Sequence, residues 1–124
     1  MAQSMRDFER TFVAGATTLA AKQYYMVKQH TDGTLILAAA ATDSIVGVLQ
    51  NKPAVGASAL VRFGGTTKVV AGGTIAVGAF VTSDSSGLAV ATTNAGDVVI
   101  GQYLGTASAA SGDIIEIVMT KFKY

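Results

Sequence analysis

The distribution of glycine and proline constrains the fold of this chain more than any other feature of its sequence. Fourteen glycines and a single proline occur among 124 residues, and the glycines separate short runs of β-branched and aromatic residues. This pattern is typical of strands joined by tight turns. It predicts a mainly β protein, a small single-domain β-barrel or sandwich, and leaves the choice between the two open.

Nine strands are expected, and three pairs of them should form hairpins. The strand ranges are 23–29, 34–38, 45–50, 57–63, 67–71, 74–82, 88–92, 98–106 and 113–122. Hairpin turns are expected at Asp32-Gly33, at Gly64-Gly65 and at residues 83–87, because glycine and aspartate tolerate the backbone angles that such turns need. In the last strand Ile115 and Ile117 alternate with Glu116, and this alternation places Phe122 on the face of Glu116.

The first fifteen residues differ from the rest and carry much of the charge, so we divide the chain into an N-terminal segment, 1–15, and a β-rich domain, 16–124. Ser4 is a candidate helix N-cap, and Met5, Phe8 and Phe12 follow at helical spacing. Two interpretations stay open: a short helix packed on its own core, or an arm that docks on a neighbouring subunit.

Composition excludes several functional classes. Only 14% of the residues are charged and the net charge is +1, so the chain lacks the positive field that draws nucleic acid. No apolar run approaches the roughly 18 residues of a membrane helix, and no signal peptide is recognisable. The expected place of synthesis and assembly is therefore a cytoplasm. Half of the residues are hydrophobic, which suggests that a partner covers part of the surface.

Candidate catalytic and metal-binding residues are scarce. The only histidine, His30, lies in a predicted turn, and the chain has no cysteine, which excludes the usual zinc spacings and thiolate chemistry. Asp84-Ser85-Ser86-Gly87 and the remaining aspartates are explained by turn chemistry. We therefore expect no enzymatic activity, no cofactor and no metal ion. Glycines at 73, 96 and 112 each precede an apolar strand, but this weak echo does not establish a repeat fold.

From Ile45 to Val118 the sequence resembles the tailed-phage head decoration, or capsid cement, proteins. The matching features are Gly47-Val48-Leu49 before a turn with proline, Ala57-x-Ala59-x-Val61 leading to Gly64, Ala71-Gly72-Gly73 with Gly78, Val81, Asp84 and Gly87, Ile100-Gly101 with Leu104-Gly105 and Ala107, and Gly112-Asp113 with Ile115 and Ile117. The resemblance implies a structural virion protein, commonly a homotrimer, that binds the outer surface of an assembled phage head and clamps neighbouring major capsid proteins. It further implies a location on the capsid surface, after assembly in the host cytoplasm.

Both ends of the chain carry aromatic residues among charged ones, and we expect the partner contacts there. The candidate interface residues are Met5, Phe8, Phe12, Phe122 and Tyr124. The alternative function is a carbohydrate- or receptor-binding module, such as the base of a head fibre. Tyrosines could stack on sugars in such a module, although tyrosine is equally suited to a protein interface.

Overall fold

The computed structural model describes residues 8–15 and 19–124. These residues form ten strands and no helix, so no described segment could cross a membrane as an apolar helix. The strands are β1 (Glu9–Val13), β2 (Met26–Gln29), β3 (Leu35–Leu37), β4 (Ile45–Leu49), β5 (Ser58–Arg62), β6 (Thr66–Val70), β7 (Phe80–Ser83), β8 (Ala89–Ala91), β9 (Val98–Leu104) and β10 (Ile114–Lys123).

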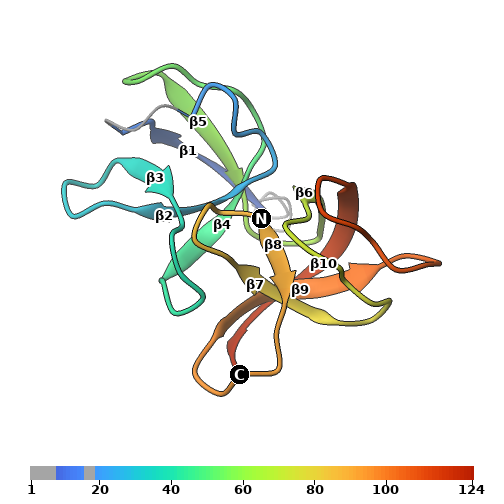
Figure 1. Ribbon diagram of the computed structural model, residues 1–124. Helices are drawn as coiled ribbons and strands as arrows, with labels where there is room; N and C mark the ends of the chain where they lie inside the picture. The colour runs from blue at the N-terminus through green and yellow to red at the C-terminus, as the bar shows by residue number, and fades with distance from the viewer. Residues whose placement is uncertain (1–7, 16–18) are drawn as a thin grey trace, which may run out of the picture.

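Two antiparallel five-stranded sheets make up the molecule, one after the other along the chain (Figure 1). The N-terminal sheet has the order β1-β5-β4-β2-β3, and the C-terminal sheet has the order β6-β10-β9-β7-β8. One buried cluster contains side chains from both sheets, including Met26 and Val48 from the first and Val81 and Ile117 from the second. The sheets therefore share a core, and the prediction of a small, mainly β single domain is confirmed as a sandwich-like fold.

Two of the three predicted hairpins are correct. β2 pairs with β3 across the Asp32-Gly33 turn, and β7 pairs with β8 across residues 84–88. The hairpin predicted at Gly64-Gly65 is wrong, because the chain passes there from one sheet to the other: β5 pairs with β1 and β4, whereas β6 pairs with β10. The strand predicted at 74–82 is shorter in the structure than expected, because β7 begins only at Phe80 and Ile75 makes only an isolated bridge to Ala109.

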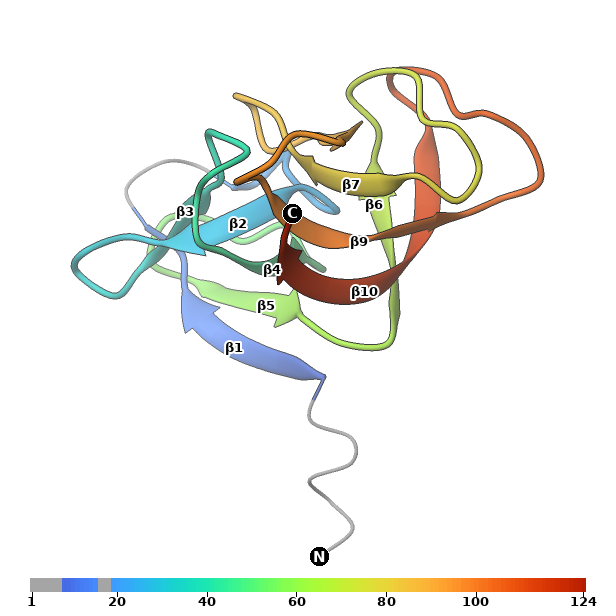
Figure 2. The ribbon, with the colours of Figure 1, turned by 90° about the horizontal axis from the view of Figure 1, so that it is seen from below.

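The helical interpretation of the N-terminal segment is wrong for the described residues. Glu9–Val13 form strand β1, which pairs with β5 at the edge of the N-terminal sheet (Figure 2). Phe12 lies opposite the core residue Ala59 and packs on the N-terminal core, because alternate residues of a strand share a face. An ion pair of 2.9 Å between Arg62 and Glu9 adds to this pairing. Met5 lies outside the described residues.

The alternation predicted for the last strand holds only in its first half. Ile115 and Ile117 are buried, and Glu116 between them is exposed. Between Met119 and Phe122 the pairing of β10 with β9 shifts by one residue. A shift of one residue turns the side chains that follow it to the other face of the sheet. The alternation seen at Ile115 and Ile117 therefore cannot be extended to assign a face to Phe122.

The two sheets are structural duplicates, which the sequence pattern did not predict. β1 to β5 have the same order in their sheet as β6 to β10 have in theirs. Each sheet is also closed by one parallel bridge between corresponding residues: Ala14 with Leu35 in the first and Ala71 with Ala89 in the second. We call β1–β5 with their loops the N-half and β6–β10 with theirs the C-half.

Corresponding residues in β2–β4 and β7–β9 lie 54 positions apart. Met26 pairs with Val48 as Phe80 pairs with Gln102, and Gly47 takes the place of Gly101. A Cβ atom on Gly101 would lie 2.5 Å from Val118 O and 2.8 Å from Ile117 Cδ1, and one on Gly47 would overlap Arg62 O and lie 2.9 Å from Val61 Cγ1. Both glycines thus allow the same close approach of two strands.

Backbone conformation follows the duplication as well. Tyr24, the one described residue other than glycine with a positive φ, 70°, corresponds to Gly78, whose φ is 82°. The Tyr24 N–H donates to Leu49 O and the Gly78 N–H donates to Tyr103 O, which are again corresponding atoms. A positive φ is costly for a tyrosine, so the fold imposes this conformation on it.

Candidate functional site

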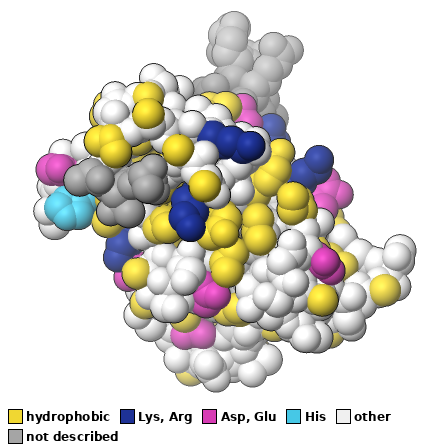
Figure 3. Space-filling view, turned by 45° about the horizontal axis from the view of Figure 1, so that its top comes forward, with side chains coloured by type: hydrophobic (Ala, Val, Ile, Leu, Met, Phe, Trp, Pro, Cys, Tyr) yellow, Lys and Arg dark blue, Asp and Glu magenta, His cyan; other side chains and the backbone are white. Residues whose placement is uncertain are grey.

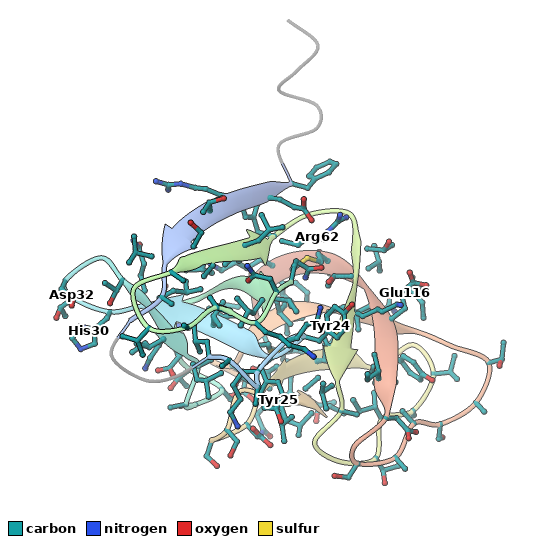
Figure 4. All side chains as sticks on the ribbon, turned by 90° about the horizontal axis from the view of Figure 1, so that it is seen from above. Tyr24, Tyr25, His30, Asp32, Arg62 and Glu116 are labelled. Atoms are coloured by element: carbon teal, nitrogen blue, oxygen red, sulfur yellow. The ribbon has the colours of Figure 1, made fainter. Side chains whose placement is uncertain are left out.

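The polar groups that could perform chemistry do not converge. His30 and Asp32 are exposed at the tip of the loop between β2 and β3, far from Glu116 on the opposite side (Figure 4). The Asp32 carboxylate accepts hydrogen bonds from the Thr34 hydroxyl and N–H, and these lower the pKa of Asp32. Residues 8–15 and 19–124 contain no group of three histidine, aspartate or glutamate side chains that could hold a metal ion.

Asp43 is a structural aspartate. Partial burial would raise its pKa, but the Ala39 N–H at 2.7 Å and the Lys28 ammonium at 2.9 Å stabilise the carboxylate and lower the pKa overall. Asp97 holds the corresponding position in the C-half and accepts a hydrogen bond of 2.5 Å from the Thr92 hydroxyl. Both carboxylates therefore brace loops that precede β4 and β9.

The surface is poor in charge and carries exposed apolar side chains. Uncharged groups dominate the face in Figure 3, where hydrophobic side chains gather near the centre. Among the described residues, the exposed large hydrophobic side chains are Phe8, Val13, Val55, Phe63, Val77, Leu104, Ile114, Phe122 and Tyr124. Four of these nine are aromatic, and they fall into two groups, one from each half of the chain. Aromatic residues contribute most to protein interfaces, so these groups are the candidate sites.

The first group is a pair of phenylalanines at the start of β1. Phe8 and Phe63 are 45% and 40% exposed, and the Phe63 N–H donates to Phe8 O at 2.8 Å. The Phe8 ring lies over Gly64, where a Cβ atom would collide with it. In the C-half the corresponding hydrogen bond joins Met119 N–H to Gly65 O. The phenylalanine pair is therefore peculiar to the N-half and is not required by the repeated architecture.

The second group is the C-terminal aromatic cluster, Phe80, Phe122 and Tyr124. The Phe80 ring meets Phe122 edge-on, with centroids 5.2 Å apart, and lies 6.3 Å from the ring of Tyr124. Phe122 and Tyr124 are stacked at 6.5 Å with an angle of 28° between their planes. The last residue is held in place because the Tyr124 N–H donates to Asp97 O and the Gly96 N–H donates to Tyr124 O.

A shallow hollow of about 260 Å³ lies beside this cluster. Its lining consists of Gly78, Ala79, Phe80, Ala91, Thr92 and Thr93, from the start of β7 and the end of β8. Glycine, alanine and one aromatic ring make most of this lining apolar. The hollow is open to solvent and suits a side chain or a tight turn of a partner better than a reaction that must exclude water.

The structure describes four of the five interface residues expected from the sequence, all but Met5, and separates them. Phe122 and Tyr124 lie together, and Phe8 is exposed in the other group. Phe12 packs on its own core, with the Arg10 guanidinium 4.8 Å from its ring centroid. Phe80 and Phe63 were missed because each lies within a predicted strand, where a phenylalanine reads as core. No pattern in the sequence around Phe63 or Phe80 indicated that either side chain reaches the surface.

The tyrosines considered for sugar binding do not form one surface. Tyr103 is buried and donates to Ala107 O at 2.8 Å. Tyr24 and Tyr25 are partly buried, and the Lys22 ammonium lies 4.9 Å from the Tyr25 ring centroid. Only Tyr124 joins an exposed aromatic group.

Comparison with known proteins shows which family this sequence belongs to. Residues 7–119 match the phage cement protein family. The chain belongs to this family. The match covers nearly the whole described fold, including β1, and so extends further toward the N-terminus than the resemblance noted in the sequence.

A solved structure shares the fold of this cement protein. It is described as the head fiber gp8.5 N base in bacteriophage phi29; it has 22% sequence identity and a TM-score of 0.69, and the alignment covers 94% of this chain and 99% of the other. No protein with a curated description matches the sequence. Family membership makes the chain a phage structural protein associated with the capsid of the virion, and its predicted family is confirmed.

Proposed function

We propose that this cement protein binds the outer surface of an assembled phage head, contacts the major capsid protein and stabilises the capsid lattice, as a homotrimer and without catalytic activity. The observation that carries the proposal is the charge-poor surface with two exposed aromatic groups in a chain of this family. Exposed aromatic groups on a small protein mark interfaces, and here two are available for two kinds of partner.

The Phe8–Phe63 pair is the proposed contact with the capsid. It occurs only in the N-half, so the fold does not need it, and roughly two-fifths of each side chain is open to solvent. Covering that remaining area would stabilise the complex by about 1 kcal/mol per ring. A single pair gives a weak contact, and several pairs in one oligomer give a strong one because the second and third contacts become intramolecular.

Co-sedimentation with expanded heads that lack the protein tests this function. The wild-type chain should pellet with the heads, and the double variant Phe8→Ser, Phe63→Ser should bind at least about tenfold more weakly while keeping a cooperative melting transition. Val55→Ser removes an exposed apolar side chain from a loop of the same half and serves as the control. Failure of the wild-type chain to pellet would refute head binding, and normal binding of the double variant would refute the assigned contact.

A carbohydrate- or receptor-binding role is the second candidate. The stacked rings of Phe122 and Tyr124 beside a hollow with the exposed Thr93 favour it, since sugars bind between aromatic faces and hydroxyl groups. The fold shared with a head-fibre base agrees with such a module on a phage head. A glycan array with the wild-type chain and the Tyr124→Ser variant tests it: binding that depends on Tyr124 supports this role, and an array without binding rejects it.

A further inference from the structure

Within the chain, a turn of the C-half docks on a face of the N-half. Met26 and Val48 of that face are fully buried, and the Met26 N–H donates to Gly87 O at 2.8 Å. Gly87 belongs to the turn between β7 and β8, and a Cβ atom there would lie 3.0 Å from Met26 O and 3.2 Å from Leu37 Cδ2. The junction between the halves thus includes a tight turn seated on the face of β2 and β4 that carries Met26 and Val48.

The C-half has the same face, but no turn within residues 8–15 and 19–124 is seated on it as the 84–88 turn is seated on the N-half. Phe80 and Gln102 correspond to Met26 and Val48 and are partly exposed. The local backbone is alike in both halves, because the Thr92 N–H donates to Phe80 O and the Ala38 N–H donates to Met26 O, each at 3.0 Å. The hollow of about 260 Å³ occupies this face. Phe122 and Tyr124 contact Phe80 and form one side of its surroundings.

The N-half in turn has a second copy of the docking turn, and this copy is exposed. Gly33 has a φ of 87° and Gly87 one of 78°, and their N–H groups donate to the corresponding atoms His30 O and Asp84 O. Gly87 is buried, whereas Gly33 is exposed and would have no atom within 4 Å of an added Cβ. In the described part of the chain, one face and one turn therefore lack the partner that the internal junction provides, and Gly33 O accepts a hydrogen bond only from the exposed Gln29 side chain. This face and this turn have the form of the two sides of the internal junction.

From this we infer that the 30–34 turn of one copy docks in the C-half hollow of a second copy. The occupant is a second copy because the junction between the two halves already joins these two surfaces within one chain. In the new contact, Gly33 O takes the place of Gly87 O and accepts a hydrogen bond from the Phe80 N–H of the neighbouring copy. Such a head-to-tail contact joins different surfaces of identical chains, so it closes into a ring when the rotation between copies permits. The inference rests on the self-association proposed above and names its interface.

Engineered cysteines test the contact directly, since the natural chain has none. Thr31 is an exposed turn residue, and Thr93 is an exposed residue of the hollow. A mixture of Thr31→Cys and Thr93→Cys chains, oxidised with diamide, should give a disulfide-linked pair, because a disulfide requires the two Cα atoms to lie within about 7 Å. Ser111→Cys, exposed in another loop of the C-half, replaces Thr93→Cys in the control mixture. The expected yield is about tenfold higher for the first mixture than for the control.

A second variant measures the association without cysteines. Ala91 lines the hollow and is exposed, so Ala91→Arg fills the hollow without removing a core contact. In sedimentation velocity it should associate at least about tenfold more weakly than the wild-type chain, whereas the control Ala110→Arg should associate normally. Normal assembly of Ala91→Arg, or no excess of the 31–93 disulfide in solution and on heads, overturns the inference. If the protein binds heads but the 31–93 disulfide does not form, the inference is wrong and the proposed function stands. If the disulfide forms but the protein does not bind heads, only the proposed function is wrong.

Discussion

Adding a methyl group at Gly47 or Gly101 should destabilise the protein by the same amount, because the duplicated fold uses both glycines alike. The Cβ of Gly101→Ala would lie 2.5 Å from Val118 O, where ordinary contacts begin at 3.4 Å. The backbone of β10 must therefore move by nearly an ångström. Overpacking of this kind costs about 1–3 kcal/mol, and the strained ladder hydrogen bond adds about 1 kcal/mol. The smaller entropy of the unfolded alanine variant offsets about 0.5–1 kcal/mol.

The net loss is about 1–3.5 kcal/mol for each variant, which corresponds to a fall in Tm of about 4–14 °C for a domain of this size. Thermal unfolding of purified Gly47→Ala and Gly101→Ala, followed by circular dichroism, measures it. Gly73→Ala is the matched control, because the nearest atom to its added Cβ is Val90 Cγ1 at 3.9 Å. This control should melt at or slightly above the wild-type temperature. A Tm within about 2 °C of wild type for either test variant would refute the close-approach argument.

Three further predictions use single substitutions. Phe12→Ala should lower the free energy of unfolding by about 2–3 kcal/mol in chemical denaturation, because Phe12 packs on the N-terminal core, while head binding per folded molecule is unchanged. His30→Ala should change that free energy by less than about 0.5 kcal/mol, since the side chain is exposed; a loss above about 2 kcal/mol would contradict its placement in a solvated turn. Asp43→Asn should cost about 1–2 kcal/mol at pH 7, where the wild-type carboxylate is charged and bound to Lys28 and the Ala39 N–H. The folded-state pKa of Asp43 is lowered, so this contribution is present above the unfolded pKa of about 3.9 and lost as the pH falls through the folded pKa. Urea unfolding at pH 7 and below pH 4 should show the gap between wild type and Asp43→Asn narrowing in acid.

Local signals in the sequence predicted most strands, because turn residues and β-branched runs act over a few positions. They failed where distant partners decide the outcome. Gly64-Gly65 has the composition of a hairpin turn, yet β10, some fifty residues away in sequence, provides the partner of β6. Phe8 and Phe12 fit a helical period, but Phe8, Arg10 and Phe12 fit a strand period equally well, and the edge offered by β5 selects the strand.

The duplication was hidden because its two halves share few residues. Gly33 and Gly87, Asp43 and Asp97, and Gly47 and Gly101 coincide at a spacing of 54, whereas the glycines at 73, 96 and 112 that drew attention are not counterparts of one another. The two halves share the residues that the backbone requires, such as glycine in the turn and glycine where two strands approach closely. Most other side chains differ between the halves. The predicted hairpin does bring together the two segments that line the hollow, but nothing in their residues shows that this face lies open.

Duplication also accounts for how a chain with so little charge could join copies of itself, as proposed above. The turn of the C-half covers the face of the N-half. The turn of the N-half and the face of the C-half therefore stay open, and the duplicated fold itself generates two complementary surfaces. Neither surface needs charge, because a turn seated on an apolar face is held by backbone hydrogen bonds and burial, as Gly87 is on Met26. Copies joined in this way would present one Phe8–Phe63 pair each. A loss of about 1.4 kcal/mol at each pair would weaken one contact tenfold, and an oligomer that binds through all of its pairs would be weakened by the product of those factors. Loss of self-association by Ala91→Arg should therefore reduce head binding as well, although Ala91 lies outside the proposed capsid contact.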